Sequence, residues 1–280
     1  MEAPNPIGIA ISNADLSHTD KVAIGSTLGA HYFLLAPIDA AAWKHSSLLR
    51  TDYQNYCATI TNAGMQPVIA ITPTVDHVDC APTYTDIVVT CAPSLVVLRT
   101  PETETRDHLN TLARICHSNR ARSTHAPIDS SDIAIMLASD DQTFADILDP
   151  TERRIMSSAF TEKRTAIAER TASYLDMVQQ SDVDFVNIGW NSQTDEHFER
   201  IVREIAARTG KPVVSTALAR PIDEYCAERL MKSALKAGLP YAIWYFSVEG
   251  PRAYSLKRPD GTLGKSASLF THFMRRHFTH

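Results

Sequence analysis

The sequence predicts a single (β/α)8 (TIM) barrel, in which eight parallel strands form a closed sheet and helices cover its outside. The chain has 280 residues, 44% of them hydrophobic and 21% charged, which fits a barrel built as one domain over residues 1–280. Short apolar runs rich in β-branched residues alternate with amphipathic stretches along the whole chain. A glycine separates several of those stretches from the next apolar run, as in successive right-handed βαβ units.

The apolar runs are the expected strands. Most of them are continuous rather than alternating, which is typical of parallel strands that are covered on both faces. The expected strands are residues 6–12, 31–37, 66–72, 94–99, 132–138, 183–189, 212–216 and 241–246.

The stretches between them carry helix signals. Gly64, Gly210 and Gly238 stand where helices end, and Pro150 precedes the longest amphipathic stretch. The expected helices are residues 52–62, 105–119, 151–180, 194–209, 223–236 and 265–277, with a short one around 83–90.

An open, doubly wound sheet is the competing architecture. The barrel pattern is weakest over residues 77–93, which contain two prolines and predict only that short helix. An open sheet of that type usually has a glycine-rich phosphate loop after its first strand, and residues 11–15 have none. We therefore favour the barrel.

Composition argues against several classes of partner. The formal net charge is −5 and the basic residues are scattered, so we expect no nucleic-acid partner. No apolar run approaches the ~20 residues of a membrane span. The five cysteines form no CxxC pair and the histidines have no metal-ligand spacing, so we expect no metal and no cofactor. No signal peptide is visible, but the polar start resembles a trimmed export signal, so an exported and a cytoplasmic protein both remain open.

Four segments, taken in order, resemble the retaining barrel glycosidases of the cellulase and β-xylosidase type. They are residues 95–102 (Leu-Val-Val-Leu-Arg-Thr-Pro-Glu), 184–190 (Asp-Phe-Val-Asn-Ile-Gly-Trp), 211–218 (Lys-Pro-Val-Val-Ser-Thr-Ala-Leu) and 242–247 (Ala-Ile-Trp-Tyr-Phe-Ser). They fall at the fourth, sixth, seventh and eighth expected strands, so the resemblance runs over nearly the whole chain. It implies a glycosidase-like barrel with a sugar site at the carboxyl ends of the strands.

Both catalytic positions depart from the pattern of that clan. The resemblance places Thr100 where the acid/base glutamate stands and Ala217 where the nucleophilic glutamate stands. Retaining hydrolysis needs two carboxyl groups about 5–5.5 Å apart, and neither residue has one. We therefore expect no hydrolysis by that mechanism. A rearranged site that uses Asp140, Asp141 or Glu249 is the alternative.

Aromatic and amide side chains near the strand ends are the candidate sugar contacts. Trp244 is either a stacking platform or part of the barrel wall, and Trp190 stands beside Asn191, whose amide both donates and accepts hydrogen bonds. Trp43 either lines the rim or packs between helices.

Arg99 is a charged residue at the end of an otherwise apolar strand. It either pairs internally with Asp140, Asp141 or Glu102, which we favour, or binds an anionic ligand such as an acidic sugar.

The functional hypothesis is a pseudoenzyme: a glycoside-hydrolase-like barrel that binds a carbohydrate or a protein partner in polysaccharide metabolism. The alternatives are an active glycosidase with rearranged carboxylates and a structural subunit of a larger assembly. Fold alone does not decide among the three.

Overall fold

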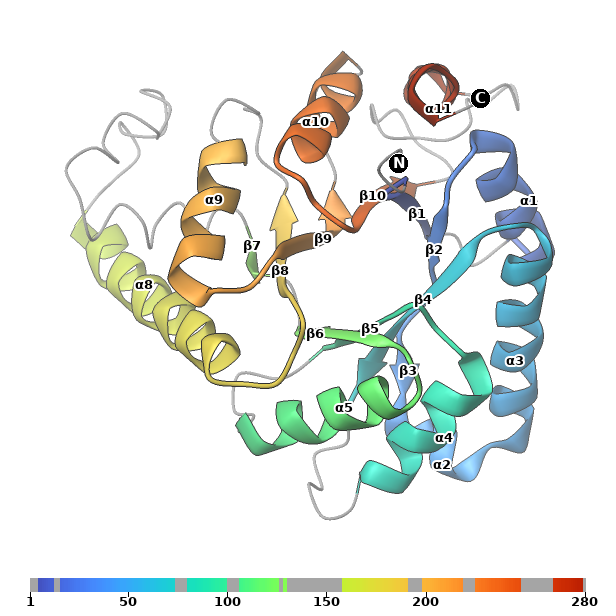
Figure 1. The fold of residues 1–280 in the computed structure, drawn as a ribbon, viewed down its shortest axis with the longest axis horizontal. Helices are drawn as coiled ribbons and strands as arrows, with labels where there is room; N and C mark the ends of the chain where they lie inside the picture. The colour runs from blue at the N-terminus through green and yellow to red at the C-terminus, as the bar shows by residue number, and fades with distance from the viewer. Residues whose placement is uncertain are drawn as a thin grey trace.

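Parallel strands surrounded by helices make up the fold (Figure 1). The computed structural model describes residues 5–12, 16–73, 80–99, 106–125, 128–129, 158–190, 198–218, 225–247 and 264–278. Within these residues, eight strand positions form a nearly closed ring. In ring order they are β1 (Ile7–Ser12), β2 (Tyr32–Leu34), β4 (Gln66–Thr72), β5 (Leu95–Leu98), β6 (Arg122–His125), β8 (Val186–Trp190), β9 (Val213–Leu218) and β10 (Ala242–Ser247).

Two joints close the ring. β1 pairs with β10 over six residue pairs, from Ile7 with Ala242 to Ser12 with Ser247. Between β6 and β8 the joint is a single bridge, Thr124 with Phe185, next to which the Asp184 N–H donates to the Ser123 carbonyl at 3.0 Å. Two further short strands extend the sheet: β3 (Ile38–Asp39) pairs with β4, and β7 (Ile128–Asp129) pairs with β8. The expected barrel is confirmed.

The helices lie outside the ring. They are α1 (His18–Leu28), α2 (Ala40–His45), α3 (Ser47–Asn62), α4 (Ala81–Cys91), α5 (Arg106–Ser118), α8 (Ser158–Gln179), α9 (Phe198–Thr209), α10 (Tyr225–Lys236) and α11 (Lys265–Phe278). In the part of the chain that the structure describes, no helix is both long and apolar enough to cross a bilayer.

Local signals explain how several helices begin and end. The Ser17 hydroxyl accepts from the Asp20 N–H at the start of α1, and Gly29 ends that helix with φ of 81°. Helix α4 spans residues for which only a short helix is expected. Pro82 is tolerated in its first turn because the N–H that proline lacks has no partner inside the helix at that position.

The fifth strand differs from the expectation. The strand beside β5 is β6, Arg122–His125, whereas the expected strand at residues 132–138 lies outside the described residues. β6 is polar, and the Ser123, Thr124 and His125 side chains are nevertheless buried. Hydrogen bonds replace apolar packing there: Thr124 Oγ1 donates to the Phe185 carbonyl at 3.2 Å. A search for apolar runs therefore misses this strand.

Strand residues divide into two apolar clusters according to which face of the sheet they occupy. The inner cluster contains strand and strand-flanking residues only and fills the barrel: Ala10, Tyr32, Leu34, Val68, Ala70, Leu95, Val97, Phe185, Val214, Tyr241 and Ile243. The outer cluster joins the alternate strand residues, such as Ile9, Phe33 and Ile188, to the buried faces of the helices. Because successive strand residues face opposite sides, membership of a cluster fixes the direction of the next residue along the strand.

A carboxylate ties β6 to β8 at the amino end of the barrel. Asp184 is 12% exposed, and it accepts from Arg122 Nη1 at 2.7 Å and from the Ser123 N–H at 2.9 Å. His117 Nε2 lies 2.9 Å from the same carboxylate. Burial works to raise the pKa of Asp184, but hydrogen bonds from His117, Ser123 and Arg122 outweigh it and hold the pKa below its usual range.

Asp184→Asn should lower the free energy of unfolding at pH 7 by about 1.5–3 kcal/mol, because a carboxylate that accepts several hydrogen bonds becomes a neutral amide. The pKa of Asp184 is lower in the folded than in the unfolded chain. This contribution is therefore complete above the unfolded pKa of about 3.9 and is lost as the pH falls through the lower folded value. Urea unfolding at pH 7 and at pH 3 measures both effects.

Asp182→Asn is the matched control, since Asp182 is exposed and should contribute little. If the free energies of unfolding of wild type and Asp184→Asn differed as much at pH 3 as at pH 7, this account of the carboxylate would be wrong.

Candidate functional site

Polar and aromatic residues gather where the inner faces of the strands reach the carboxyl end of the barrel, here called the mouth. Ser12, Thr72, Arg99 and Tyr245 each stand two residues after a member of the inner cluster, so they continue the barrel-facing side of their strands. Ser12 and Arg99 are exposed, Thr72 is half-buried and Tyr245 is 38% exposed. In barrels of this class, ligand sites form at this end.

Arg99 is positioned by the sheet although it follows β5. Its N–H donates to the Ile71 carbonyl at 2.7 Å, which continues the ladder between β4 and β5 by one residue. No side chain among the described residues pairs with its guanidinium. The favoured internal partners, Glu102, Asp140 and Asp141, lie outside the described residues.

An irregular register marks the wall between β8 and β9. Asn187 pairs with Val214, but Gly189 pairs with Ala217, so one extra residue is accommodated on β9. The fully buried Asn187 side chain stabilises this bulge: its Oδ1 accepts from the Thr216 N–H at 3.1 Å, and its Nδ2 donates to Thr216 Oγ1 at 2.8 Å. Bulges of this kind often re-aim side chains next to functional sites.

Ala217 is half-buried on β9 near the mouth, paired with Gly189 on the neighbouring strand. Its methyl group has no hydrogen-bonding capacity, so this position supplies neither a nucleophile nor a proton. Unlike Ala217, five further candidate positions lie outside the described residues: Thr100, Asp140, Asp141, Asn191 and Glu249.

The two strand tryptophans face the helices rather than the mouth. Trp244 and Trp190 both belong to the outer cluster, and each is 2% exposed. Trp244 pairs with Ile9 on β1 and with Leu218 on β9, which are outer-cluster residues as well. Trp190 packs edge-on against Phe198 of α9, with the ring centroids 4.9 Å apart. Trp244 was expected to be either a stacking platform or part of the barrel wall, and these contacts match the barrel wall.

Trp43 packs between helices. It is 1% exposed on α2, and its Nε1 donates to Asp86 Oδ2 of α4 at 2.8 Å. Its ring lies edge-on to Tyr53 of α3 at a centroid distance of 6.1 Å. These contacts hold α2 against the two longer helices and leave no face of the indole for a ligand.

Sequence patterns did not single out Tyr245 or Asp129. Tyr245 lies beside Trp244 in a continuous apolar run, and only the pairing of Tyr245 with Ala10, an inner-cluster residue, places it on the barrel side. Asp129 lies on the two-residue strand β7, in register with Gly189 near the mouth. A further acidic residue, Asp39, is engaged locally: its Oδ1 accepts from the Ala41 and Ala42 N–H groups at the start of α2.

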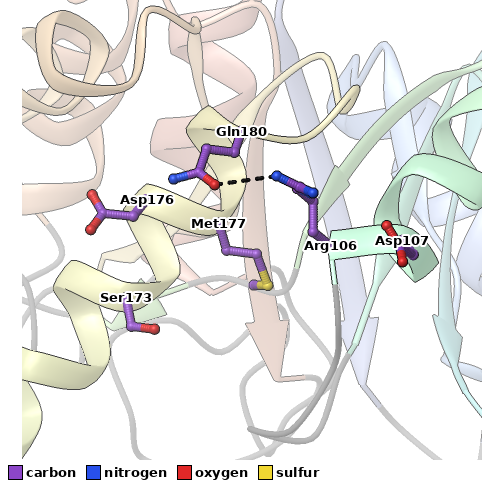
Figure 2. Close-up of a pocket in the computed structure, with 6 residues that line it drawn as sticks. All are labelled: Arg106, Asp107, Ser173, Asp176, Met177 and Gln180. Carbon is purple, nitrogen blue, oxygen red and sulfur yellow. Dashed lines mark hydrogen bonds between the residues drawn. The ribbon is translucent and has the colours of Figure 1, made fainter.

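A pocket lies on the outside of the barrel, between α5 and α8 (Figure 2). It is an open pocket of about 380 Å³. Arg106 Nη1 donates across it to Gln180 Oε1 at 3.4 Å. Its lining residues are Arg106, Asp107, Ser173, Asp176, Met177 and Gln180. In the described part of the chain, no group of three or more His, Cys, Asp or Glu residues is arranged to hold a metal ion.

Solved structures with the same fold include several glycoside hydrolases. The chain superposes on the catalytic domain of a hyperthermophilic chitinase from Pyrococcus furiosus with a TM-score of 0.59 and 14% identity, covering 98% of this chain and 96% of that one. A β-glycosidase matches with a TM-score of 0.57 and 10% identity over 92% and 85% of the two chains. A chitinase from Pseudoalteromonas aurantia matches with a TM-score of 0.53 and 9% identity over 86% and 93%.

These likenesses establish a glycosidase-like barrel fold. No family model and no curated protein matches the sequence. At such low identity the likeness concerns the arrangement of the backbone, and the chemistry has to be argued from the residues at the mouth.

Proposed function

We propose that this chain is a glycosidase-like barrel that binds a saccharide at its mouth without cleaving it by the two-carboxylate mechanism. The observation that carries the proposal is the set of side chains at the mouth. Ser12, Thr72 and Arg99 can hydrogen-bond to sugar hydroxyls, Tyr245 presents an aromatic ring, and Ala217 stands where the resemblance calls for the nucleophile. These side chains can bind a sugar, but none of them supplies the carboxyl groups that the two-carboxylate mechanism requires.

The comparisons support a saccharide as the ligand class. One structure with this fold is a chitinase from Pyrococcus furiosus complexed with chito-oligosaccharides, with a TM-score of 0.58 and 14% identity. For this chain, a polysaccharide-derived oligosaccharide is the corresponding proposal.

Tyr245 is the proposed stacking platform in place of the buried Trp244. Apolar faces of sugar rings pack on aromatic rings, and the tyrosine hydroxyl remains available for a hydrogen bond. With 38% exposure, Tyr245 is one of three large apolar side chains that are exposed in the described part of the chain, and it alone lies on a barrel strand.

Tyr245→Ala should weaken binding about tenfold or more with the fold intact, because the variant removes the ring on which the sugar packs. Titration calorimetry with chitotetraose, cellotetraose, xylotetraose and tetragalacturonate identifies the tightest ligand, and the variant is then tested on it. Tyr245→Phe keeps the ring and should retain most of the affinity. If Tyr245→Ala bound the oligosaccharide as tightly as wild type, the mouth would not be the binding site.

Asp129 favours a second candidate function, an active glycosidase. Its register with Gly189 places one acidic residue near the mouth, and a partner carboxylate would have to come from Asp140, Asp141 or Glu249. Mass spectrometry of the same four oligosaccharides after prolonged incubation decides between the two functions. Cleavage that disappears in Asp129→Asn would establish the enzyme, whereas intact oligosaccharides together with measurable binding would support the binding protein.

A third outcome would point to a structural subunit. In that case no oligosaccharide binds, and the chain elutes from a size-exclusion column with a much larger mass when its cellular partner is present.

A further inference from the structure

In the described part of the chain the Arg99 side chain has no partner, and the same holds for the exposed Arg120. Most of the others are held by an acidic residue or a carbonyl group. Examples of such pairs are Arg50 with Asp86, Arg122 with Asp184, Arg200 with Glu204 and Arg208 with Asp176.

The position of Arg99 is not that of an ordinary surface arginine. Its backbone is fixed by the hydrogen bond to Ile71, and it continues the barrel-facing side of β5 after Val97. The guanidinium group is therefore tethered to a rigid strand end at the mouth instead of to a helix surface. Because the backbone is already fixed, only the side-chain torsions of Arg99 have to be ordered when it binds an anion.

Two acidic residues also lie near this end of the barrel: Asp39 is in register with Thr72, and Asp129 is in register with Gly189. Ser12, Thr72 and Tyr245 are uncharged at neutral pH, and Ala217 is apolar. The Asp39 carboxylate accepts from the Ala41 and Ala42 N–H groups at the start of α2, so it is engaged within its own segment. Arg99 therefore supplies an exposed positive charge at the mouth, to which an anionic group of a ligand can bind.

Arg99 and the proposed platform face each other. Counting round the ring, β5 is the fourth strand position and β10 is the eighth, so Arg99 and Tyr245 lie on opposite sides of the mouth. One oligosaccharide that crosses the mouth can then meet the aromatic ring on one side and the guanidinium group on the other.

We infer that the saccharide is acidic: a carboxylate or sulfate group on one sugar binds the Arg99 guanidinium, while another sugar packs on Tyr245. The planar donor fork of arginine matches the two oxygens of such a group. The inference rests on the proposed function and specifies the class of saccharide.

The test compares an acidic oligosaccharide with a neutral one. Calorimetry of the full chain with tetragalacturonate, with a sulfated heparin disaccharide and with neutral chitotetraose gives three affinities for wild type and for R99Q. We expect at least one acidic ligand to bind more tightly than chitotetraose and to lose about tenfold or more in R99Q, while chitotetraose is unaffected. Tetragalacturonate carries carboxylates only, whereas the heparin disaccharide carries a carboxylate and sulfates, so a response to tetragalacturonate shows that a carboxylate suffices and a response to heparin alone shows that it does not.

R120Q is the matched control. Arg120 is exposed in the turn before β6, at the opposite end of the barrel, so its substitution changes the net charge equally without touching the mouth. If R120Q weakens acidic ligands as much as R99Q does, a general charge effect replaces the specific contact and the inference is wrong.

Failure of the inference is distinguishable from failure of the proposed function. Equal affinities for acidic and neutral ligands, unchanged in R99Q, would overturn the acidic class and leave saccharide binding in place. No affinity for any oligosaccharide would overturn both. If R99Q lowered only the free energy of unfolding and left acidic binding intact, Arg99 would be an internal ion-pair partner, and the inference would again be wrong.

Discussion

Trp244→Ala should lower the free energy of unfolding by about 3–5 kcal/mol, the usual cost of truncating a large buried aromatic side chain. Trp244 is 2% exposed and packs between its neighbours on β1 and β9, so alanine would leave a cavity in the layer between the barrel and its helices. Denaturant unfolding followed by circular dichroism measures the effect.

The adjacent Tyr245→Ala is the internal comparison, because the two residues are consecutive on one strand but face opposite sides of the sheet. We expect Tyr245→Ala to cost far less stability and to lose saccharide affinity instead. The opposite pattern, with a stable Trp244→Ala that no longer binds sugar, would show that the indole faces the ligand and that the two faces of β10 are exchanged.

Gly8→Ala should destabilise the barrel by about 3 kcal/mol or more, because there is no space for a side chain at this position. A Cβ atom on Gly8 would lie 2.5 Å from Ile243 Cδ1, 2.6 Å from Tyr32 Cβ and 2.8 Å from the Tyr32 carbonyl oxygen. The isoleucine tip can rotate away, but the Tyr32 backbone belongs to the paired strand β2 and cannot move without disturbing the sheet. Thermal and urea unfolding measure the loss.

Gly64→Ala separates this steric effect from the conformational freedom of glycine. Gly64 has φ of 80°, and a Cβ atom added to it would meet nothing within 4 Å, so alanine there causes only backbone strain of about 1–2 kcal/mol. If Gly8→Ala were as stable as wild type, β2 and β10 would be able to move away from β1 to make room for the added methyl group, and the expected steric cost would be wrong.

The sequence allowed the barrel to be predicted because seven of its eight strands are apolar runs and glycines end several helices. It missed β6, since Ser123 and Thr124 are buried with hydrogen-bond partners that are distant in sequence, and the buried His125 ring packs against Tyr174 of α8. It also missed α1, whose amphipathic pattern is weak and which contains Gly25 at close approach to Ile9 and Phe33. Both features depend on tertiary contacts that no local pattern contains.

The candidate site was predictable only in part. The end of β5 was identified from the sequence, because a charged residue that follows an apolar run indicates the end of a buried strand. The direction of the strand aromatics was not predictable, since a continuous apolar run such as Ala242–Ser247 contains no alternation that separates the two faces. Pairing with Ala10 resolves that ambiguity and moves the proposed contact from Trp244 to Tyr245.

The pairing of β1 with β10 has a consequence for how the protein is made in the cell. The first strand of the chain finds one of its two neighbours only in a strand that is synthesised more than 200 residues later. Until then, one edge of β1 and the inner cluster beside it stay uncovered on a nascent chain that is still attached to the ribosome. Because contacts so distant in sequence form slowly and exposed strand edges invite aggregation, we expect a ribosome-bound, unfinished chain to depend on chaperones until β10 has emerged.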